Sequence, residues 1–315
     1  MKRTLWLIRE SALGDVILCE PVLAALAARH PGAVLTLVTR AAYHPLFAHH
    51  PQLGGLLTPA QARRLPPPDL SIDLQNRIRT RLLAARAGER RHWRKRRGFD
   101  LVRTLGGRPL HRSYRGGPHQ LERMAASLGL PPLRPPELPP TPEALAEAAR
   151  LVPPGAAVLV PGAGQAEKRW PIEHFRALAL RLAARGLPVV AVGGPGEGPL
   201  LEAVVRHTGT VVPVTMALPI IGALLAQAAV VVGNDSGLMQ LAAAVGAAAV
   251  VIFGPTPPGR WGPAAGRGLV VARDLPCAPC SDHGRRACPL GTRACLQGLS
   301  VDDVFAAASG SAKNS

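Results

Sequence analysis

One carboxylate, Asp15, follows a short apolar segment and begins a stretch with helical spacing. The loop before it reads Ser11-Ala12-Leu13-Gly14, and its glycine lets the backbone approach a ligand closely. Asp15 could act as a general base, or it could only cap the helix that starts there. The loop does not follow the pattern G-x-G-x-x-G, which argues against an ordinary dinucleotide-binding site.

A second loop, from Pro161 to Pro171, combines small residues with one lysine. Small residues directly after a strand leave backbone N–H groups open to an anion. Lys168 stands just before a predicted helix, whose N-terminus adds a positive field. These features are typical of a phosphate site, and the alternative is a flexible loop with a solvated lysine. The Walker A pattern G-x-x-x-x-G-K-S/T does not occur.

Two more polar loops follow predicted strands. Asp235 and Ser236 stand at the start of a helix that either side chain could cap. The backbone N–H groups of the first turn, from Ser236, Gly237 and Leu238, are then open to an anion. Glu197, after a glycine-rich loop, could accept hydrogen bonds from ribose hydroxyls or could be only an exposed acid.

The elements that must position these loops alternate between strand and helix. In the first part, residues 4–8 read as a buried strand, a helix extends to Ala28, and a second strand covers 34–38. In the second part, helices separate predicted strands at 158–160, 189–192, 211–212, 230–232 and 249–253. This order predicts an α/β fold with parallel, doubly wound sheets, which bind ligands at the carboxyl ends of their strands.

A proline-rich stretch divides the chain. Seven of the twelve residues from 131 to 142 are proline, which excludes helix and favours a stiff, extended connection. We therefore predict an N-terminal domain over residues 1–142 and a C-terminal domain over 143–315, with a ligand cleft between their strand ends. The length of 315 residues and the apolar content of 47% allow a buried core in each half.

The positive charge of the chain is concentrated in one segment. Lys and Arg number 37 against 20 Asp and Glu, which gives a net charge of +17. Between Arg77 and Arg115, 14 basic residues accompany only two acids, Glu89 and Asp100. Such an excess predicts a polyanionic partner. Codon bias toward Arg, Ala, Gly and Pro is an alternative cause, because only four of the 37 basic residues are lysines.

Targeting and membrane-spanning signals are not found in the sequence. The apolar start Leu5-Trp6-Leu7-Ile8 ends at Arg9, too early for a signal peptide. The most hydrophobic stretch is interrupted at Gly233–Gly237 and at Gly254 before it reaches the roughly 18 apolar residues of a membrane span. We therefore expect a cytoplasmic protein.

Four of the five cysteines fall within 19 residues, at Cys277, Cys280, Cys288 and Cys295. In a reducing compartment, a C-x2-C pair followed by two more cysteines suggests structural zinc more than disulfides. The second C-x2-C pair of a typical zinc site is missing, so reduced or redox-labile thiols are favoured.

The order of the motifs resembles that of the ADP-heptose:lipopolysaccharide heptosyltransferases, glycosyltransferase family 9. The resemblance extends from about residue 4 to about residue 305, and the late cysteine cluster resembles one found in many members. It implies a GT-B fold, with two Rossmann-like domains facing a central cleft. It also implies a metal-independent, inverting transfer of a sugar from a nucleotide donor to a lipopolysaccharide-core acceptor. The motifs that carry it are Ser11-Ala12-Leu13-Gly14-Asp15, Lys168-Arg169-Trp170-Pro171, Gly193-Gly194-Pro195, Asp235-Ser236-Gly237-Leu238-Met239, Phe253-Gly254-Pro255-Thr256 and Arg260-Trp261-Gly262-Pro263.

The resemblance further implies a role for each matching residue. Asp15 matches the proposed catalytic base, and Ser11 and Gly14 lie where the acceptor binds. The donor residues that it implies are Lys168 for the diphosphate, Glu197 for the ribose, Met216 beside adenine, and Asp235 with the backbone donors of Ser236, Gly237 and Leu238.

Some positions depart from the family pattern. Gln240 stands where members usually have His, so it can donate a hydrogen bond but cannot carry charge. Pro257 stands in a segment where members have Asp. Ala163 and Gly164 stand where some members have side chains with a hydroxyl group. In this chain the backbone N–H groups would therefore have to bind the phosphate.

The expected partners follow from the resemblance: a nucleotide-sugar donor such as an ADP-sugar and an anionic glycolipid acceptor, with no cofactor, no metal and no nucleic acid. The segment Arg77–Arg115 would line or flank the acceptor site and contact the anionic inner membrane surface, unless it is only a solvated face. One rival is a nucleic-acid-binding protein whose Trp93, Phe99 and Tyr114 stack on bases. Another is a GT-B enzyme with a different sugar nucleotide.

Overall fold

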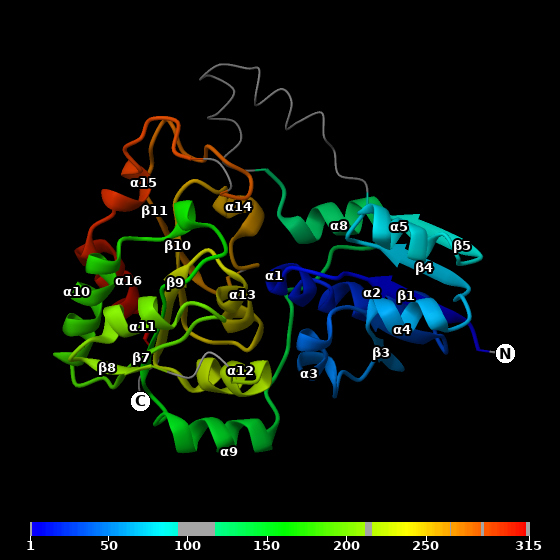
Figure 1. The fold of residues 1–315 in the computed structure, drawn as a ribbon, viewed down its shortest axis with the longest axis horizontal. Coiled ribbons are helices and arrows are strands. Elements are labelled where there is room, and N and C mark those ends of the chain that lie inside the picture. The colour runs from blue at the N-terminus through cyan, green and yellow to red at the C-terminus, as the bar shows by residue number, and fades with distance from the viewer. Residues whose placement is uncertain (1, 94–116, 212–215, 265, 285–286, 313–315) are drawn as a thin grey trace. The chain divides into compact units, whose positions relative to one another are not determined.

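The chain forms two compact units, each built around one parallel sheet (Figure 1). The computed structural model describes residues 2–93, 117–211, 216–264, 266–284 and 287–312. Of these, 2–93 and Gln120–Leu138 belong to the first unit, and 117–119 and the residues from Pro139 onward belong to the second. The predicted α/β class with two parallel sheets is confirmed.

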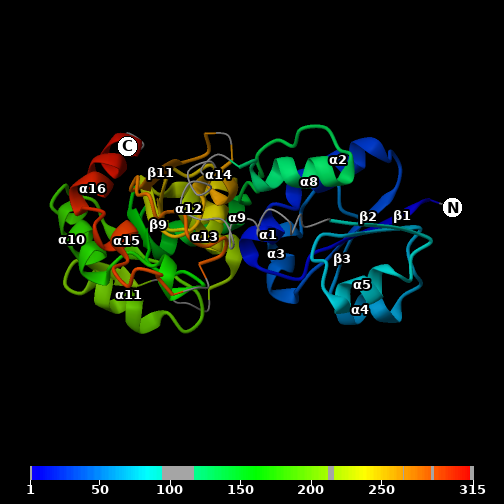
Figure 2. The ribbon, with the colours of Figure 1, turned by 90° about the horizontal axis from the view of Figure 1, so that it is seen from above.

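The first unit has a five-stranded sheet in the order β3-β2-β1-β4-β5. Its strands are β1 (Thr4–Ile8), β2 (Val34–Val38), β3 (Gly55–Leu57), β4 (Leu70–Asp73) and β5 (Glu89–His92). Figure 2 shows helices on both sides of these strands, with α2 (Glu20–Arg29) and α8 (Gln120–Leu128) on one side and α4 (Pro59–Arg64) and α5 (Ile78–Ala84) on the other. The short segments α1 (Leu13–Ile17), η1 (Ala41–Tyr43) and α3 (His44–Phe47) complete the unit.

Alternation along β1 explains why this sheet buries both faces. Trp6 and Ile8 pack with Leu83 of α5 in one apolar cluster. Successive side chains of a strand point to opposite faces, so Leu5 and Leu7, which are also buried, face the other side. A parallel sheet covered on both faces accounts for the nearly continuous apolar sequence of its strands.

The helix predicted to continue to Ala28 is two helices in the structure, and that prediction was wrong. α1 ends at Ile17, and α2 begins at Glu20 with Pro21 in its first turn. Proline has no backbone N–H to donate to the preceding turn, so it begins a helix more readily than it continues one. Val16 and Leu23 are nevertheless both buried, as their apolar spacing predicts.

A buried carboxylate holds the proline-rich stretch against the first unit. The Glu20 side chain of α2 is 2% exposed and accepts a hydrogen bond of 2.9 Å from Nη1 of Arg134. It accepts another of 2.9 Å from the backbone N–H of Glu137, and His50 lies 3.4 Å away. Burial raises the pKa of Glu20, but these hydrogen bonds outweigh it and hold the pKa below its ordinary value of 4.5.

Replacing Glu20 should therefore destabilise the chain in a pH-dependent way. The pKa of this carboxylate is lower in the folded chain than in the unfolded chain. Its contribution to stability is therefore complete at a pH above the unfolded-state pKa, and it is lost as the pH falls through the folded-state pKa. We expect Glu20→Gln to lower the free energy of unfolding by about 1–3 kcal/mol at pH 7. Denaturant unfolding at several pH values should show the difference shrinking below pH 4.5. If the difference in unfolding free energy between the two chains stays constant as the pH falls, the stabilising role of the Glu20 carboxylate is contradicted.

The second unit has a six-stranded sheet in the order β11-β10-β9-β6-β7-β8. Its strands are β6 (Ala157–Val160), β7 (Val189–Ala191), β8 (Gly209–Val211), β9 (Val230–Asn234), β10 (Ala249–Phe253) and β11 (Leu269–Ala272). Its helical segments are α9 (Pro142–Leu151), η3 (Ala166–Lys168), α10 (Ile172–Ala183), α11 (Gly198–Val205), α12 (Leu218–Gln227), α13 (Gly237–Ala244), α14 (Pro258–Trp261), α15 (Ala294–Gln297) and α16 (Val301–Ser311).

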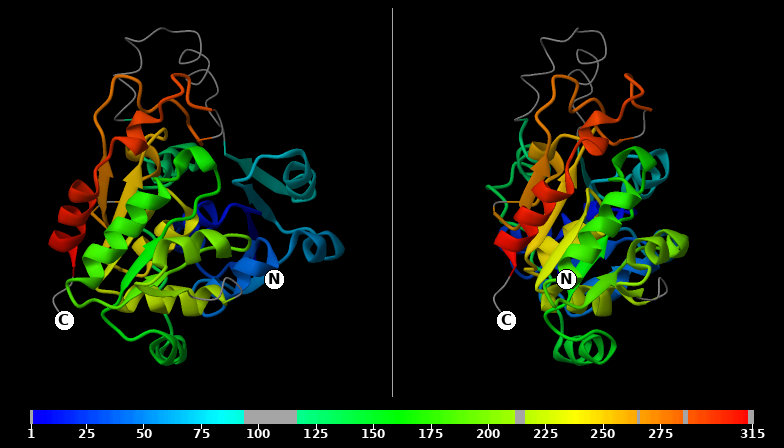
Figure 3. Two further views of the ribbon diagram at one scale, coloured as in Figure 1. Left: turned by 60° about the vertical axis from the view of Figure 1, so that its left-hand side comes forward. Right: turned by 90° about the vertical axis from the view of Figure 1, so that its left-hand side faces the viewer.

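The core of this unit lies between the sheet and a layer of helices. Figure 3 shows α10 in green and α16 in red side by side across one face of the strands. Phe175 and Leu178 of α10 pack there with Val304 of α16 and Val232 of β9. Among the described residues, no helix is both long enough and apolar enough to cross a bilayer.

Candidate active site

Three polar loops of the second unit meet at one edge of its sheet. They follow β6, β9 and β10, and the order β10-β9-β6 makes these strands neighbours. Between β6 and β9 the strand order reverses, and at such a reversal the loops at the carboxyl ends diverge and leave room for a ligand. This arrangement brings the predicted phosphate loop next to the loop that begins at Asp235.

Lys168 and Asp235 form the centre of this site. Nζ of Lys168 lies 2.7 Å from Oδ2 of Asp235, and their side chains are 16% and 9% exposed. The hydroxyl of Thr256, after β10, donates to the same carboxylate oxygen over 2.8 Å. Lys168 is therefore held in place and is not the solvated side chain of the alternative reading. The sequence did not reveal this role of Thr256, although the residue ends the motif Phe253-Gly254-Pro255-Thr256.

The loop that carries Lys168 is fixed by side chains from three directions. Asn234, buried at the end of β9, accepts from the backbone N–H of Trp170 and donates to the carbonyl of Pro161. Arg169 donates to the carbonyl of Ala163 within the loop. Arg293, far along the sequence, donates to the carbonyl of Arg169 over 2.8 Å. A loop with this many contacts presents its groups in one arrangement, which favours ligand binding.

The start of α13 offers hydrogen-bond donors beside this pair. Its first N–H groups, from Gly237 and the residues after it, have no acceptor within the helix. Ser236 precedes it, but its side chain does not cap the helix, and its buried hydroxyl has no hydrogen-bond partner among the described residues. The expectation that Asp235 or Ser236 caps this helix is wrong, because Asp235 is bound to Lys168 and Thr256. The half-buried Leu238 follows in the same turn.

Glu197 lies against two glycines of neighbouring loops. Its Oε2 accepts from the backbone N–H of Gly194 over 2.8 Å, and its Oε1 lies 3.7 Å from Nη2 of Arg169. A Cβ placed on Gly162 would be 2.1 Å from Oε2 of Glu197, and one on Gly193 would be 2.8 Å away. The two glycines thus leave the space that the carboxylate fills, and Glu197 is not simply an exposed acid.

Met216 precedes α12, Gln240 lies in α13, and Pro257 precedes α14. Met216 is half-buried just before α12. Gln240 donates from Nε2 to the carbonyl of Trp261 over 2.6 Å, so its amide holds the α14 segment. Pro257 is the N-cap residue of α14, which begins at Pro258.

In the first unit, Asp15 is paired with a buried arginine. Arg9, 5% exposed at the end of β1, forms an ion pair with Oδ2 of Asp15. Its Nε also donates to the carbonyl of Ser11 over 2.9 Å. Asp15 lies in the first turn of α1, whose N-cap residue is Ala12, and its Oδ2 accepts from the backbone N–H of Ala12 over 3.4 Å, so the carboxylate also caps the helix. No described residue forms a hydrogen bond with Oδ1 of Asp15.

The loop before Asp15 is tied to the neighbouring strand β4. The backbone N–H of Ser11 donates to Oε1 of Gln75, just after β4, over 3.2 Å. Gly14 is half-buried in the first turn of α1. The sheet order places β1 beside β4, where the strand order of this unit reverses. Asp15, Ser11 and Gly14 therefore occupy the same kind of edge as Lys168 does in the second unit.

Only part of the basic segment Arg77–Arg115 belongs to the described residues. Residues 77–93 form α5, β5 and their connections, and the rest, with Phe99 and Tyr114, lies outside them. Trp93 is 5% exposed, so it is not available to stack on a base. This observation removes one support of the nucleic-acid reading.

The late cysteines line one small cavity and are free thiols. Burial, with the nearby Cys295 next in effect, raises the pKa of Cys280 to about 11. The backbone N–H of Arg293 lowers the pKa of Cys288. Gly284 of the same segment packs on Lys168, because a Cβ there would lie 2.5 Å from its Cγ. The described residues include no group of three or more His, Cys, Asp or Glu arranged to hold a metal ion.

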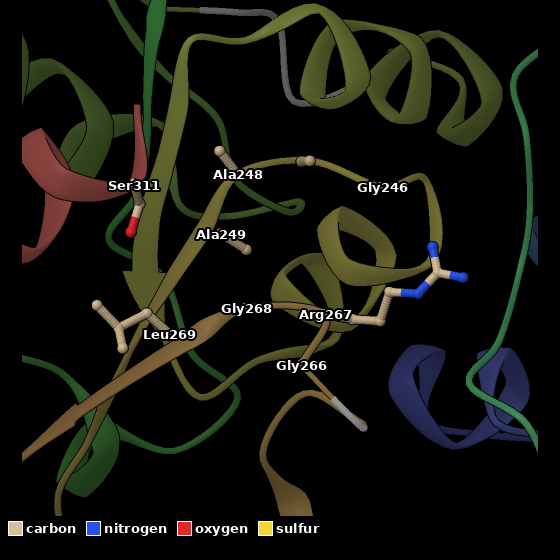
Figure 4. Close-up of a pocket in the computed structure, with 9 residues that line it drawn as sticks. Gly246, Ala248, Ala249, Gly266, Arg267, Gly268, Leu269 and Ser311 are labelled. Atoms are coloured by element: carbon tan, nitrogen blue, oxygen red, sulfur yellow. The ribbon is translucent and has the colours of Figure 1, made fainter. Parts of the chain in front are cut away.

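A surface depression of about 450 Å³ lies at the opposite edge of the second sheet (Figure 4). Ala249 and Leu269, in its lining, begin β10 and β11, so it lies at the amino ends of the strands. The lining consists of small residues, Leu269 and one charged residue, Arg267. It lacks the convergent polar groups found around Lys168.

Comparison with known proteins gives consistent matches. Residues 62–290 match the model of glycosyltransferase family 9 (heptosyltransferase). Lipopolysaccharide heptosyltransferase 1 of Pseudomonas aeruginosa is 31% identical over 313 residues, which cover 87% of this chain and 85% of that protein. The structure of Escherichia coli ADP-heptose lps heptosyltransferase II superimposes with a TM-score of 0.77 at 21% identity, covering 99% of this chain and 98% of that one. For Escherichia coli heptosyltransferase WaaC with ADP, the TM-score is 0.69 at 20% identity, covering 98% and 100%.

Proposed function

The chain belongs to glycosyltransferase family 9, the heptosyltransferase family, and we propose that it transfers a heptose from ADP-heptose to an anionic lipopolysaccharide-core acceptor. The observation that carries the proposal is the Lys168–Asp235 pair beside the open first turn of α13. We take ADP-heptose as the donor and lipopolysaccharide as the acceptor because the similar proteins are named for these two compounds. The nucleic-acid alternative has no such support.

In the proposed donor site, Lys168 and the start of α13 bind the diphosphate. A leaving diphosphate gains negative charge as the bond to the sugar breaks, and a cation and oriented N–H groups stabilise it. Asp235 and Thr256 keep Lys168 in position for this role. Ser236, Gly237 and Leu238 offer the backbone donors, and the Ser236 hydroxyl, to which no part of the chain that the structure describes forms a hydrogen bond, offers one more.

The rest of the donor is assigned to neighbouring loops. Glu197 is held by the backbone of Gly194, and a carboxylate so fixed suits a pair of ribose hydroxyls. Met216 is half-buried and suits the face of an adenine ring, since its thioether is flexible and polarisable.

The proposed reaction is a single displacement at the anomeric carbon. Asp15 removes the proton from an acceptor hydroxyl as the new bond forms, and the configuration at that carbon inverts. Proton transfer to Asp15 accompanies attack, when the hydroxyl becomes acidic. Arg9 keeps Oδ2 occupied and leaves Oδ1 for the proton. Ser11 and Gly14 form the adjacent backbone that the acceptor meets.

The donor can be identified by ligand-induced stabilisation. A ligand that binds only the folded chain raises its melting temperature, and the rise grows with affinity. We expect ADP and ADP-sugars to raise it more than the matching UDP and GDP compounds do. If UDP or GDP compounds raise the melting temperature more, the donor nucleotide is UDP or GDP and not ADP. If no nucleotide raises it, the proposed donor site is refuted.

Gly162→Ala tests the place of Glu197 in this site. The new methyl group would occupy the space of the carboxylate, whose flexible side chain can swing away, so we expect stability to fall by only about 1–2 kcal/mol. The Kd for ADP should rise about tenfold, because about 1.4 kcal/mol of hydrogen bonding is lost. Gly164→Ala is the matched control, since nothing lies within 4 Å of a Cβ there. Equal ADP affinity in both variants would remove Glu197 from the site.

A further inference from the structure

One face of α5 is apolar and points away from the core. Ile78 and Leu82, one helical turn apart, are 77% and 68% exposed. The opposite face holds the helix on the sheet through Leu83 and Ala84. A helix that already buries one apolar face does not need a second for its own folding, and large exposed apolar side chains grouped together indicate an interaction surface.

The end of α4 extends this face. Arg86 donates from Nη1 to the carbonyl of Ala62 over 2.9 Å and from Nη2 to the carbonyl of Leu65 over 2.7 Å. Leu65, 43% exposed, is thereby fixed next to α5, and Figure 2 shows α4 and α5 side by side. We call this surface the α4–α5 patch, and it consists of Arg63, Arg64, Leu65, Arg77, Ile78, Arg79, Arg81, Leu82 and Arg86.

The patch is strongly cationic. It contains six arginines and no acid, and none of Arg63, Arg64, Arg77 and Arg79 has an ion-pair partner among the described residues. The acids nearest in sequence are otherwise engaged, because Asp73 is fully buried, Asp69 accepts hydrogen bonds from Thr4, and Glu89 forms ion pairs with arginines outside the patch. Arginine side chains around exposed Ile and Leu are typical of helices that lie in the interface of an anionic membrane.

The patch also begins beside the proposed base. α5 follows β4 after a short loop, and Gln75 in that loop accepts from the backbone N–H of Ser11. Arg9, the partner of Asp15, donates to the carbonyl of Leu74 in the same loop. A surface that holds the chain on a bilayer at this point would keep a lipid-anchored acceptor close to Asp15.

We propose that the α4–α5 patch docks the chain on an anionic phospholipid bilayer. Leu65, Ile78 and Leu82 enter the interface between head groups and acyl chains, and the surrounding arginines bind lipid phosphates. This inference rests on the proposed function, because it adds the surface on which a glycolipid acceptor is met.

Vesicle flotation with the full chain tests the docking surface. We expect binding to vesicles of phosphatidylcholine mixed with phosphatidylglycerol, weak binding to phosphatidylcholine alone, and loss of binding as salt is raised. Ile78→Ser with Leu82→Ser should lower the partition coefficient at least about tenfold. Arg79→Gln should lower it about fivefold at low salt, corresponding to about 1 kcal/mol per charge.

Matched controls come from the second unit. Leu151→Ser with Leu180→Ser removes two leucines that are 50% and 53% exposed, and Arg150→Gln removes an exposed arginine. Both should leave vesicle binding unchanged. The ADP-induced rise in melting temperature should be the same in all variants, which shows that each is folded with an intact donor site.

The proposal is overturned if the chain does not bind anionic vesicles, or if the patch variants bind as the controls do. Binding of random duplex DNA that these variants abolish, without vesicle binding, would assign the patch to nucleic acid. A normal ADP response without vesicle binding rejects the docking surface alone, whereas vesicle binding without any nucleotide response rejects the proposed function.

Discussion

Asp15→Asn is expected to lower the turnover number by about 10²–10⁴ while leaving the affinity for the donor unchanged. The amide has nearly the size of the carboxylate, so α1 and the contact with Arg9 should keep their geometry. Oδ1 no longer accepts a proton, and the developing charge on the acceptor oxygen is left without a base. Turnover is measured at saturating donor and acceptor, and the Kd for ADP is measured separately.

The matched control for this variant is Glu10→Gln. It removes one negative charge from the same loop, but Glu10 does not belong to the Arg9 pair. We expect its turnover to stay near that of the unaltered chain. If Asp15→Asn and Glu10→Gln lower the turnover number equally, the loss comes from removing a negative charge from the loop and not from removing a base. If Asp15→Asn turns over normally, Asp15 is not the base.

Lys168→Met is the second change with a large expected effect. It removes the cation that the donor diphosphate would contact, and loss of one such group typically costs about 10²–10³ in rate. It also leaves the Asp235 carboxylate, 9% exposed, without its cation. An unpaired buried charge is costly, so we expect the free energy of unfolding to fall by about 1–3 kcal/mol.

A double variant separates the two effects. Combining Lys168→Met with Asp235→Asn removes both charges, and Thr256 can still donate to the new amide oxygen. Stability should recover to near the starting value, whereas kcat/KM and ADP affinity should stay low. Recovery of activity together with stability would mean that Lys168 acts only as a structural partner of Asp235.

The fold was predictable because its strands are short, apolar and regularly spaced. The strands expected at 4–8, 34–38 and 249–253 coincide with β1, β2 and β10. The break between α1 and α2 was missed because the apolar spacing of Val16 and Leu23 continues through it, while Pro21 interrupts the hydrogen bonding. Periodicity indicates which face is buried, and it does not reveal where the backbone changes direction.

The site was predictable as a set of strand ends, and its pairings were not. The order of a parallel sheet brings loops together that are far apart in sequence, so Lys168 and Asp235 were expected at one edge. That Thr256 shares the carboxylate of Asp235, or that Arg293 holds the loop of Lys168, depends on where loops fold back. In the sequence, Arg9 is recognisable only as the charged residue that follows an apolar strand. The structure shows that it is buried and paired with Asp15.

The central claim is that this chain moves a heptose from ADP-heptose to a lipopolysaccharide-core acceptor. It is tested most directly by incubating the chain with both compounds and analysing the acceptor by mass spectrometry and NMR. The account predicts release of ADP, addition of one heptose to the acceptor, and an anomeric configuration opposite to that of the donor. An unmodified acceptor, or a product that retains the donor configuration, would contradict it.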